Sequence, residues 1–255
     1  MRFHRAALLA LSILATCAFA APEAVRKEIV DRLQKSSALP VADETVADAA
    51  SIIATGQKLW TTKFAKGGSL AGCFPNGGRR VAANYPQYDS RLKRVVTLEL
   101  AINQCRKSHG EPLYDPADPA TMGAVVAYVR SLSNGMKISV RVPTAAEGRF
   151  ESGRRMYFTR MGQRNFACAS CHIQDAGRNY DGTMLSPVVG QAAHWPEIRN
   201  GIPITLQARM RECLELMGAA PFPAGSDELN DVEYFMTYLS NGSPLKANVA
   251  RPRPQ

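Results

Sequence analysis

The sequence predicts an all-α fold, mostly helical with long loops, built from two related halves. Apolar residues recur at helical spacing in several segments, whereas the strict alternation typical of strands is scarce. The tetrapeptide Leu-Ser-Asn-Gly occurs at residues 132–135 and again at 239–242, and Cys105 precedes Cys213 by almost the same interval. Ordered landmarks that keep one offset indicate an internal duplication.

The chain begins with a segment typical of export. Arg2 and Arg5 precede an apolar run over residues 6–20, which ends in small residues. This order predicts a secretory signal peptide over residues 1–20, cleaved after Ala20. The run at residues 14–17 is a weaker match to a lipoprotein cleavage site. No later segment is apolar enough to span a membrane, so we expect a periplasmic protein without a membrane span.

The charge of the chain favours an acidic or anionic partner. The formal net charge is +9, and it falls to +7 once Arg2 and Arg5 leave with the signal peptide. Nucleic acid is not an expected partner, because the sequence has no basic stripe with interleaved aromatic residues. The ~235 residues that remain suffice for two domains, each able to bury its own core.

Residues 21–46 carry apolar residues at helical spacing, among them Val25, Ile29 and Leu33, and predict an exposed N-terminal helix followed by a linker. The first repeat is expected over residues 47–136 and the second over 144–244. The tail is assigned to residues 245–255. Its end, residues 250–255, is rich in proline and arginine and is expected to be disordered or to lie along a partner.

Each repeat is predicted to hold a helix, a cysteine site, a loop, a helix that carries a cysteine, and a last helix. Asp118 and Ser226 are start signals for the last helices, and Asn-Gly pairs at 134–135 and 241–242 are stop signals. The last helix of the first repeat has an apolar face that we expect to be buried. This face consists of Met122, Val125, Val126, Val129 and Leu132.

The second repeat contains the motif Cys168-Ala-Ser-Cys171-His172. Two thiols at this spacing can form thioethers with the two vinyl groups of one porphyrin, and the histidine that follows can coordinate its iron. The alternative is a disulfide or a thioredoxin-like redox pair. Because bacteria attach haem c after export, the signal peptide and the motif support each other. We predict a cytochrome c-like domain with one covalent haem c, held by Cys168 and Cys171 and ligated by His172.

The first repeat lacks this motif. At the corresponding place Cys73 is followed by Phe-Pro-Asn-Gly-Gly, without a second thiol or a histidine, so the first cytochrome c-like domain is expected to carry no haem. If the repeats share a fold, Cys73 and Cys105 both border the vacated pocket. In an oxidising compartment such thiols pair, so we predict a Cys73–Cys105 disulfide, with two separate buried thiols as the alternative.

The equivalence of Cys213 with Cys105 places Cys213 at the edge of the haem pocket, where no cysteine is left to pair with it. A thiolate near iron is a ligand, so Cys213 is the first choice for the distal position opposite His172. An open distal site is one alternative. Four other side chains of the second repeat are further candidates for the distal position: Met217, which lies one helical turn beyond Cys213, Met184, Met210 and His194.

Arg209 lies four residues before Cys213, so both side chains project from one face of a helix. A guanidinium at this place would offset the charge of a thiolate and offer a forked pair of donors to an oxyanion. The alternative is an ordinary surface arginine on a charged helix.

The haem motif followed by Arg209 and Cys213, in a duplicated and exported chain, resembles the SoxA family, the catalytic subunits of the SoxAX cytochromes of bacterial thiosulfate oxidation. The missing first motif, with Cys73 and Cys105 retained, resembles the single-haem members. The resemblance implies an L-cysteine S-thiosulfotransferase that couples thiosulfate to a cysteine of the sulfur carrier SoxYZ and passes two electrons to a cytochrome acceptor. It also implies a heterodimer with SoxX, Arg209 as a substrate-binding residue, and Cys213 as both distal ligand and catalytic sulfur, able to carry a persulfide.

Three other functions fit the haem motif without the resemblance. A plain periplasmic electron-transfer cytochrome would use histidine and methionine as its iron ligands. A peroxidase or another haem oxidoreductase would keep an open distal site. An interaction subunit would hold a haem of purely structural use.

Overall fold

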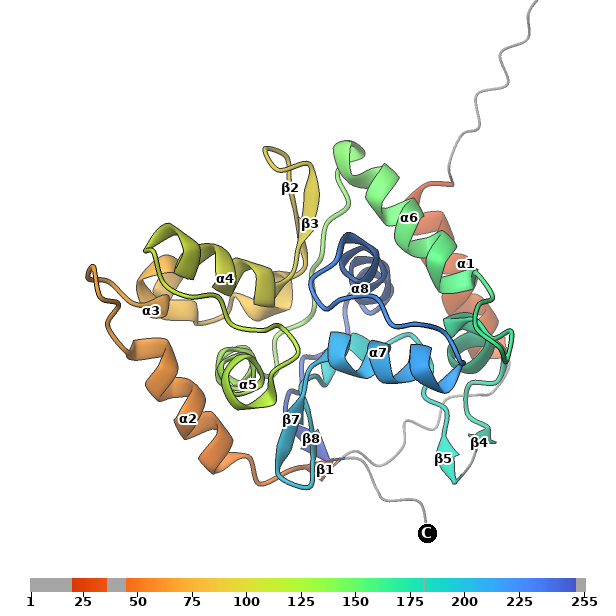
Figure 1. Ribbon diagram of the computed structural model, residues 1–255. Coiled ribbons are helices and arrows are strands. Elements are labelled where there is room, and N and C mark those ends of the chain that lie inside the picture. Colours follow the sequence, from red (N-terminus) through yellow and green to blue (C-terminus); the bar gives the residue numbers. More distant parts are fainter. Residues whose placement is uncertain (1–19, 36–44, 181, 251–255) are drawn as a thin grey trace, which may run out of the picture.

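The computed structural model describes residues 20–35, 45–180 and 182–250, so most of the predicted signal peptide lies outside the described residues. The helices are α1 (Pro22–Lys35), α2 (Ala50–Thr61), α3 (Leu70–Cys73), α4 (Leu98–Ser108), α5 (Ala124–Ser131), α6 (Glu147–Phe158), α7 (Leu206–Leu216) and α8 (Asp227–Leu239). The strands are short: β1 (Thr45–Val46), β2 (Gln87–Asp89), β3 (Arg94–Val96), β4 (Asn179–Tyr180), β5 (Thr183–Met184), β6 (Glu197–Arg199), β7 (Ile202–Ile204) and β8 (Val249–Ala250). The predicted all-α class is confirmed, with small sheets added to it (Figure 1).

The two halves repeat one arrangement of helices. In the first half α2 packs across α5, and in the second half α6 packs across α8. Each crossing is made at a glycine: a Cβ on Gly56 would lie 2.0 Å from the carbonyl oxygen of Ala124, and a Cβ on Gly153 would lie 2.0 Å from that of Asp231. Two crossings with the same close backbone approach confirm the duplication inferred from the sequence.

The predicted ends of the last helices are also confirmed. The side chains of Asp118 and Ser226 accept hydrogen bonds from backbone amides of the turn that follows each of them. After Asp118 the chain makes one π-helical turn, Pro119–Gly123, before α5 begins. Gly135 and Gly242, beyond the ends of α5 and α8, have φ angles of +80° and +88°, which glycine adopts without steric cost.

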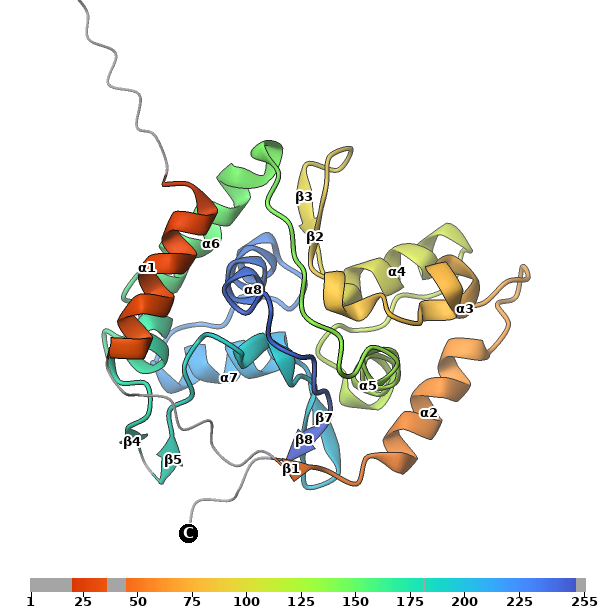
Figure 2. The ribbon, with the colours of Figure 1, turned by 180° about the vertical axis from the view of Figure 1, so that it is seen from behind.

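The expectation of an exposed N-terminal helix is corrected by the structure. Helix α1 has the predicted periodicity, but its apolar side chains Val25, Ile29 and Leu33 are buried in the core of the second half, together with Phe150. Helix α1 contacts α8, and the ribbon views show it on the same side of the molecule as α6 (Figures 1 and 2). An apolar stripe at this spacing requires a partner surface, so only the opposite face of α1 is exposed.

The first part of the predicted tail packs against the rest of the protein. Leu245 and Ala247 are buried in the core of the first half, and Val249 is buried in β8. Strand β8 pairs with both β1 and β6, in a sheet of order β1-β8-β6-β7. Apolar residues at every second position bury one face of this extended segment. Residues 251–255 lie outside the described residues.

Buried charged groups lie where the halves meet. Glu99 on α4, Arg130 on α5 and Glu233 on α8 are buried or nearly so, and Arg130 Nη2 donates to the carbonyl of Ala192 at 2.8 Å. Burial, followed by the neighbouring Glu99, raises the pKa of Glu233 to about 8. Gln207 Nε2 donates to Glu233 Oε2 at 2.9 Å. The positive charge of Arg130 partly offsets the effect of burial on both carboxyl groups.

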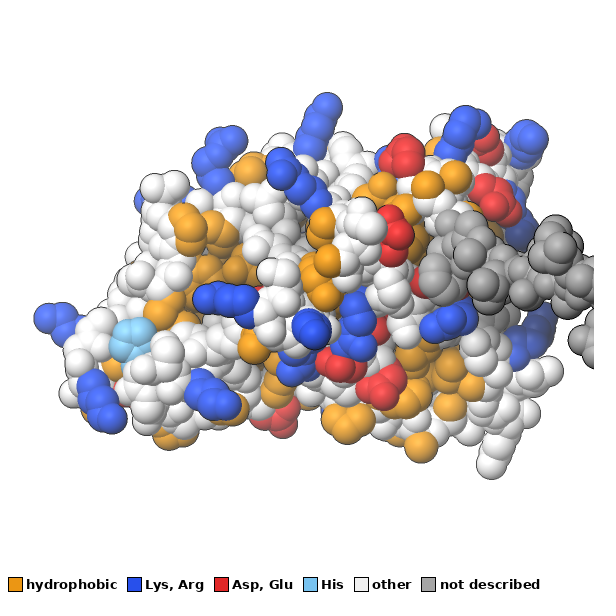
Figure 3. All heavy atoms as spheres, turned by 90° about the horizontal axis from the view of Figure 1, so that it is seen from above, with side chains coloured by type: hydrophobic (Ala, Val, Ile, Leu, Met, Phe, Trp, Pro, Cys, Tyr) orange, Lys and Arg blue, Asp and Glu red, His pale blue; other side chains and the backbone are white. Residues whose placement is uncertain are grey.

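None of the helices in the described parts of the chain is long and apolar enough to cross a lipid bilayer. On the face seen in Figure 3, Lys and Arg side chains are spread over the surface and alternate with acidic and apolar ones. This face offers no continuous basic stripe of the kind that follows a nucleic-acid backbone.

Candidate functional site

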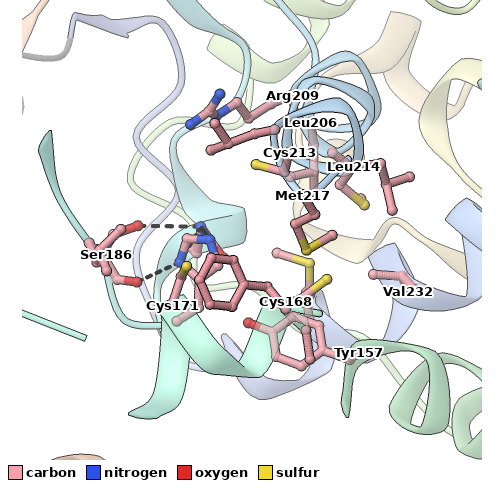
Figure 4. Close-up of a pocket in the computed structure, with 18 of the residues that line it drawn as sticks. Tyr157, Cys168, Cys171, Ser186, Leu206, Arg209, Cys213, Leu214, Met217 and Val232 are labelled. Carbon is pink, nitrogen blue, oxygen red and sulfur yellow. Dashed lines mark hydrogen bonds between the residues drawn. The ribbon is translucent and has the colours of Figure 1, made fainter. Parts of the chain in front are cut away.

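A pocket opens between α7 and the loop that carries the Cys-x-x-Cys-His motif (Figure 4). It contains about 1110 Å³ of empty space, counted to its open mouth, and most of its wall is apolar. The apolar wall includes Met156, Phe166, Trp195, Leu206, Leu214, Leu229, Val232 and Met236. An open pocket with a mostly apolar wall suits a large, flat, apolar group.

Cys168 and Cys171 line this pocket as free thiols. Burial, followed by the nearby Cys213, raises the pKa of Cys168 to about 12, and burial also raises the pKa of Cys171. Thioredoxin-like pairs instead hold one thiol at a lowered pKa. The environment therefore favours two protonated thiols, as expected for cysteines that form thioethers with a haem, over a thioredoxin-like redox pair.

His172 is held in one orientation by a backbone carbonyl. Its Nδ1 lies 2.7 Å from the carbonyl oxygen of Ser186, so Nδ1–H donates and Nε2 keeps its lone pair. Metal-bound histidines in proteins are oriented by such a bond on the nitrogen that does not bind the metal. The Gln191 amide Nε2 also lies beside this ring and 3.3 Å from Ser186 Oγ.

Helix α7 supplies the opposite wall. Cys213 and Met217 both project into the pocket, Cys213 on the side of Ser186 and Met217 on the side of Cys168 (Figure 4). Met184 and Met210 line the pocket as well. His194 is buried but is not among the lining residues, although Trp195 is. Of the five distal candidates, one cysteine and three methionines therefore reach the pocket.

Arg209 also lines the pocket, on the same side of α7 as Cys213 (Figure 4). Burial opposes the charge of its guanidinium, but the Cys213 sulfur and then Glu212 outweigh this effect and raise the pKa of Arg209. Its Nη1 donates to Glu212 Oε2 at 2.9 Å. Arg209 is therefore a fixed cation beside a sulfur rather than an ordinary surface arginine.

Two buried polar atoms support a bound group in the pocket. Among the described residues, the hydroxyl of Tyr157 and Oε1 of Gln191 are buried without a hydrogen-bond partner. Such atoms are costly unless a ligand or water satisfies them. With two thiols, an oriented imidazole and an apolar wall around them, the residues fit haem c. Sequence reasoning missed Ser186 and Gln191 because they follow the motif at no diagnostic spacing.

In the first half, Cys73 and Cys105 form the predicted disulfide, with their Cα atoms 6.0 Å apart. Phe74 follows Cys73 where the second repeat continues its haem motif, and its ring lies 4.8 Å from that of Trp60. Both rings belong to the buried core of this half. The space around the lost motif is thus filled by side chains of the protein.

The comparisons with known proteins agree with this arrangement. The family model described as SoxA/TsdA, cytochrome c domain, matches residues 55–138 and 152–245. L-cysteine S-thiosulfotransferase subunit SoxA of Chlorobaculum thiosulfatiphilum is 40% identical over 202 residues, which cover 78% of this chain and 70% of that one. SoxA of Allochromatium vinosum is 39% identical over 205 residues, 78% of this chain and 72% of that one.

The crystal structure of SoxXA from P. pantotrophus contains a chain that superimposes on this one with a TM-score of 0.73. The two chains are 26% identical, and the superposition covers 80% of this chain and 78% of that chain. The family model accounts for both halves separately, as the duplication requires. The chain therefore belongs to the SoxA/TsdA cytochrome c domain family, with two copies of the domain in one polypeptide.

Proposed function

We propose that this chain is the catalytic haem c subunit of a periplasmic L-cysteine S-thiosulfotransferase. In this proposal one haem c is bound covalently by Cys168 and Cys171, with His172 and Cys213 as its iron ligands. The chain pairs with a SoxX cytochrome and acts on thiosulfate and the carrier SoxYZ. The observation that carries the proposal is the juxtaposition of Arg209 and Cys213 on the pocket wall that faces the haem motif.

Each residue has a defined task in the proposed reaction. Ser186 holds the His172 ring so that Nε2 is available to iron. Arg209 binds and orients the thiosulfate dianion, because a guanidinium offers two parallel donors to neighbouring anionic oxygens. Cys213 presents its sulfur within the same pocket. The bound haem c supplies one-electron redox chemistry beside these groups.

The overall reaction fixes what the partners must do. A carrier thiol and thiosulfate form one sulfur–sulfur bond, which gives a cysteine S-thiosulfonate and releases one proton and two electrons. A single haem accepts one electron at a time, so a second redox centre must take part. The SoxX cytochrome and a further cytochrome acceptor fill this need, and the net positive charge favours capture of the anion.

The test is thiosulfate-dependent reduction of a cytochrome acceptor by the full chain with SoxX and reduced SoxYZ. The chain carrying Cys213→Ser should lose this activity and the thiolate-type electron paramagnetic resonance signal of the ferric protein. Met217→Leu is the matched control, because it removes another sulfur-containing side chain that lines the pocket close to Cys213 in the sequence. Full activity and an unchanged signal in the serine variant would refute the proposal.

Met217 favours one second candidate, an electron-transfer cytochrome without a substrate of its own. Its side chain is buried and lines the pocket, as a thioether ligand would require. This candidate predicts the reverse of the result above: Met217→Leu would change the signal of the ferric protein, whereas Cys213→Ser would not.

A further inference from the structure

Arg209 is the last member of a chain of charged side chains that begins on strand β6. Glu197 is buried, and its Oε1 lies 3.0 Å from Arg199 Nε. Arg199 Nη1 lies 3.0 Å from Glu212 Oε2, and the same oxygen lies 2.9 Å from Arg209 Nη1. One carboxylate oxygen therefore accepts hydrogen bonds from two guanidinium groups that come from different elements.

This geometry restrains Arg209 from outside the pocket. Glu212 lies on α7 one turn from Arg209. The Glu212 side chain is partly exposed, so without a further contact it could adopt other rotamers. Arg199 removes that freedom, because it reaches across from β6 and is itself fixed by buried Glu197. The bond to Glu212 occupies only Nη1 of Arg209, so Nε and Nη2 remain to serve a bound anion.

The duplication provides an internal comparison. Helix α4 corresponds to α7, since both begin after a capping threonine and carry a cysteine at the same position. On that correspondence Ala101 and Gln104 replace Arg209 and Glu212. On the matching strand, Gln87 and Asp89 replace Glu197 and Arg199. The copy without the haem motif keeps the helix and strand but has a different residue at each of the four positions, so the fold does not require this set of charges.

We propose that Glu212, held by Arg199, is a positioning residue that fixes the guanidinium of Arg209 above Cys213 for an oxyanion of sulfur. The proposal rests on the proposed function. It assigns a task to two residues that the sequence did not single out. The competing explanation is a solvent-exposed pair of i and i+3 side chains with no effect on the site.

Three variants of the haem-loaded full chain, assembled with SoxX, test this inference: Glu212→Gln, Arg199→Gln and the double variant. Each single variant should lower kcat/KM for thiosulfate about tenfold, chiefly by raising KM, because a misaligned guanidinium binds the anion poorly. The double variant should be no worse than Glu212→Gln, because both changes break one chain of contacts. Glu215→Gln is the matched control: it removes a carboxylate that is exposed on the same helix.

A second measurement needs no turnover. Arg209→Gln should change the electron paramagnetic resonance signal of the ferric protein, because it removes a cation beside the sulfur. Glu212→Gln and Arg199→Gln should shift the signal in the same direction, and Glu215→Gln should leave it unchanged. Thermal unfolding of each variant, compared with the wild type, checks that the fold is retained.

The outcomes separate the two proposals. Wild-type protein that shows no thiosulfate-dependent activity would refute the proposed function, whereas matching spectral shifts in the three charge variants would still support the positioning role. The positioning role is overturned if Glu212→Gln behaves like Glu215→Gln in both KM and spectrum, or if the two single effects simply add in the double variant.

Discussion

Gly153 on α6 lies directly against the backbone carbonyl of Asp231 on α8, so that a Cβ at position 153 would come within 2.0 Å of the oxygen. Neither backbone can withdraw without separating the two helices. We expect Gly153→Ala to lower the free energy of unfolding by about 3 kcal/mol or more, as severe overpacking does.

The matched control for this prediction is Gly148→Ala, in the first turn of the same helix. Nothing lies within 4 Å of a Cβ built on Gly148, and alanine favours a helix over glycine. This variant should be as stable as the wild type or slightly more stable in urea unfolding monitored by far-ultraviolet circular dichroism. Equal losses in both variants would contradict the packing explanation.

Glu233 makes stability depend on pH. Burial raises its pKa to about 8 in the folded chain, whereas the ordinary value is 4.5. Between these two values the folded state holds a proton that the unfolded state has released. The protonated group therefore contributes its full stabilisation below pH 4.5. This contribution is lost as the pH rises from there through about 8, and between the two pKa values the loss is roughly 1.4 kcal/mol per pH unit.

Glu233→Gln imitates the protonated group and should flatten this slope when urea unfolding is compared from pH 5 to pH 9. Glu228→Gln removes an exposed carboxylate in the first turn of the same helix and should keep the wild-type slope. An unchanged slope in the Glu233 variant would show that Glu99 or Asp231 carries the dependence, because burial raises the pKa of both groups.

The Cys73–Cys105 disulfide closes a loop of 32 residues. Its removal in a double serine variant should cost about 3–4 kcal/mol, because the unfolded chain gains the conformational freedom that the cross-link denies it. Urea unfolding measures this loss. The visible spectrum of the haem-loaded protein should stay as in the wild type, since the haem motif lies in the other half.

Leu245 tests the packing of the tail. Its side chain is 2% exposed and lies in the core of the first half, so Leu245→Ala should destabilise the protein by about 2–5 kcal/mol. Leu92→Ala is the control, because its side chain is 53% exposed. If both variants unfold at the wild-type midpoint, the tail does not contribute to the core.

Much of the fold and of the site could be predicted from the sequence, because the motifs that indicate them are short or occur in both repeats. The haem motif needs only five consecutive residues, the caps at Asp118 and Ser226 act within one helical turn, and the duplication revealed the Cys73–Cys105 pair. The apolar stripe of α1 was visible as well, but the surface that covers it lies more than a hundred residues away. Periodicity shows that a face is buried, not what buries it.

The rest depended on contacts that no local pattern encodes. Strands of two or three residues are too short to display alternation, so the sheet that receives β8 was not expected. Arg199 and Glu212 are ordinary charged residues in the sequence. Only the packing of β6 against α7 brings them together beside Arg209.

The ends of the chain cross between the halves: α1 precedes both repeats yet completes the core of the second, and the segment around Leu245 follows both yet completes the core of the first. A cut between the two repeats would therefore leave each half without part of its own core, so we expect the two halves to fold only as one polypeptide.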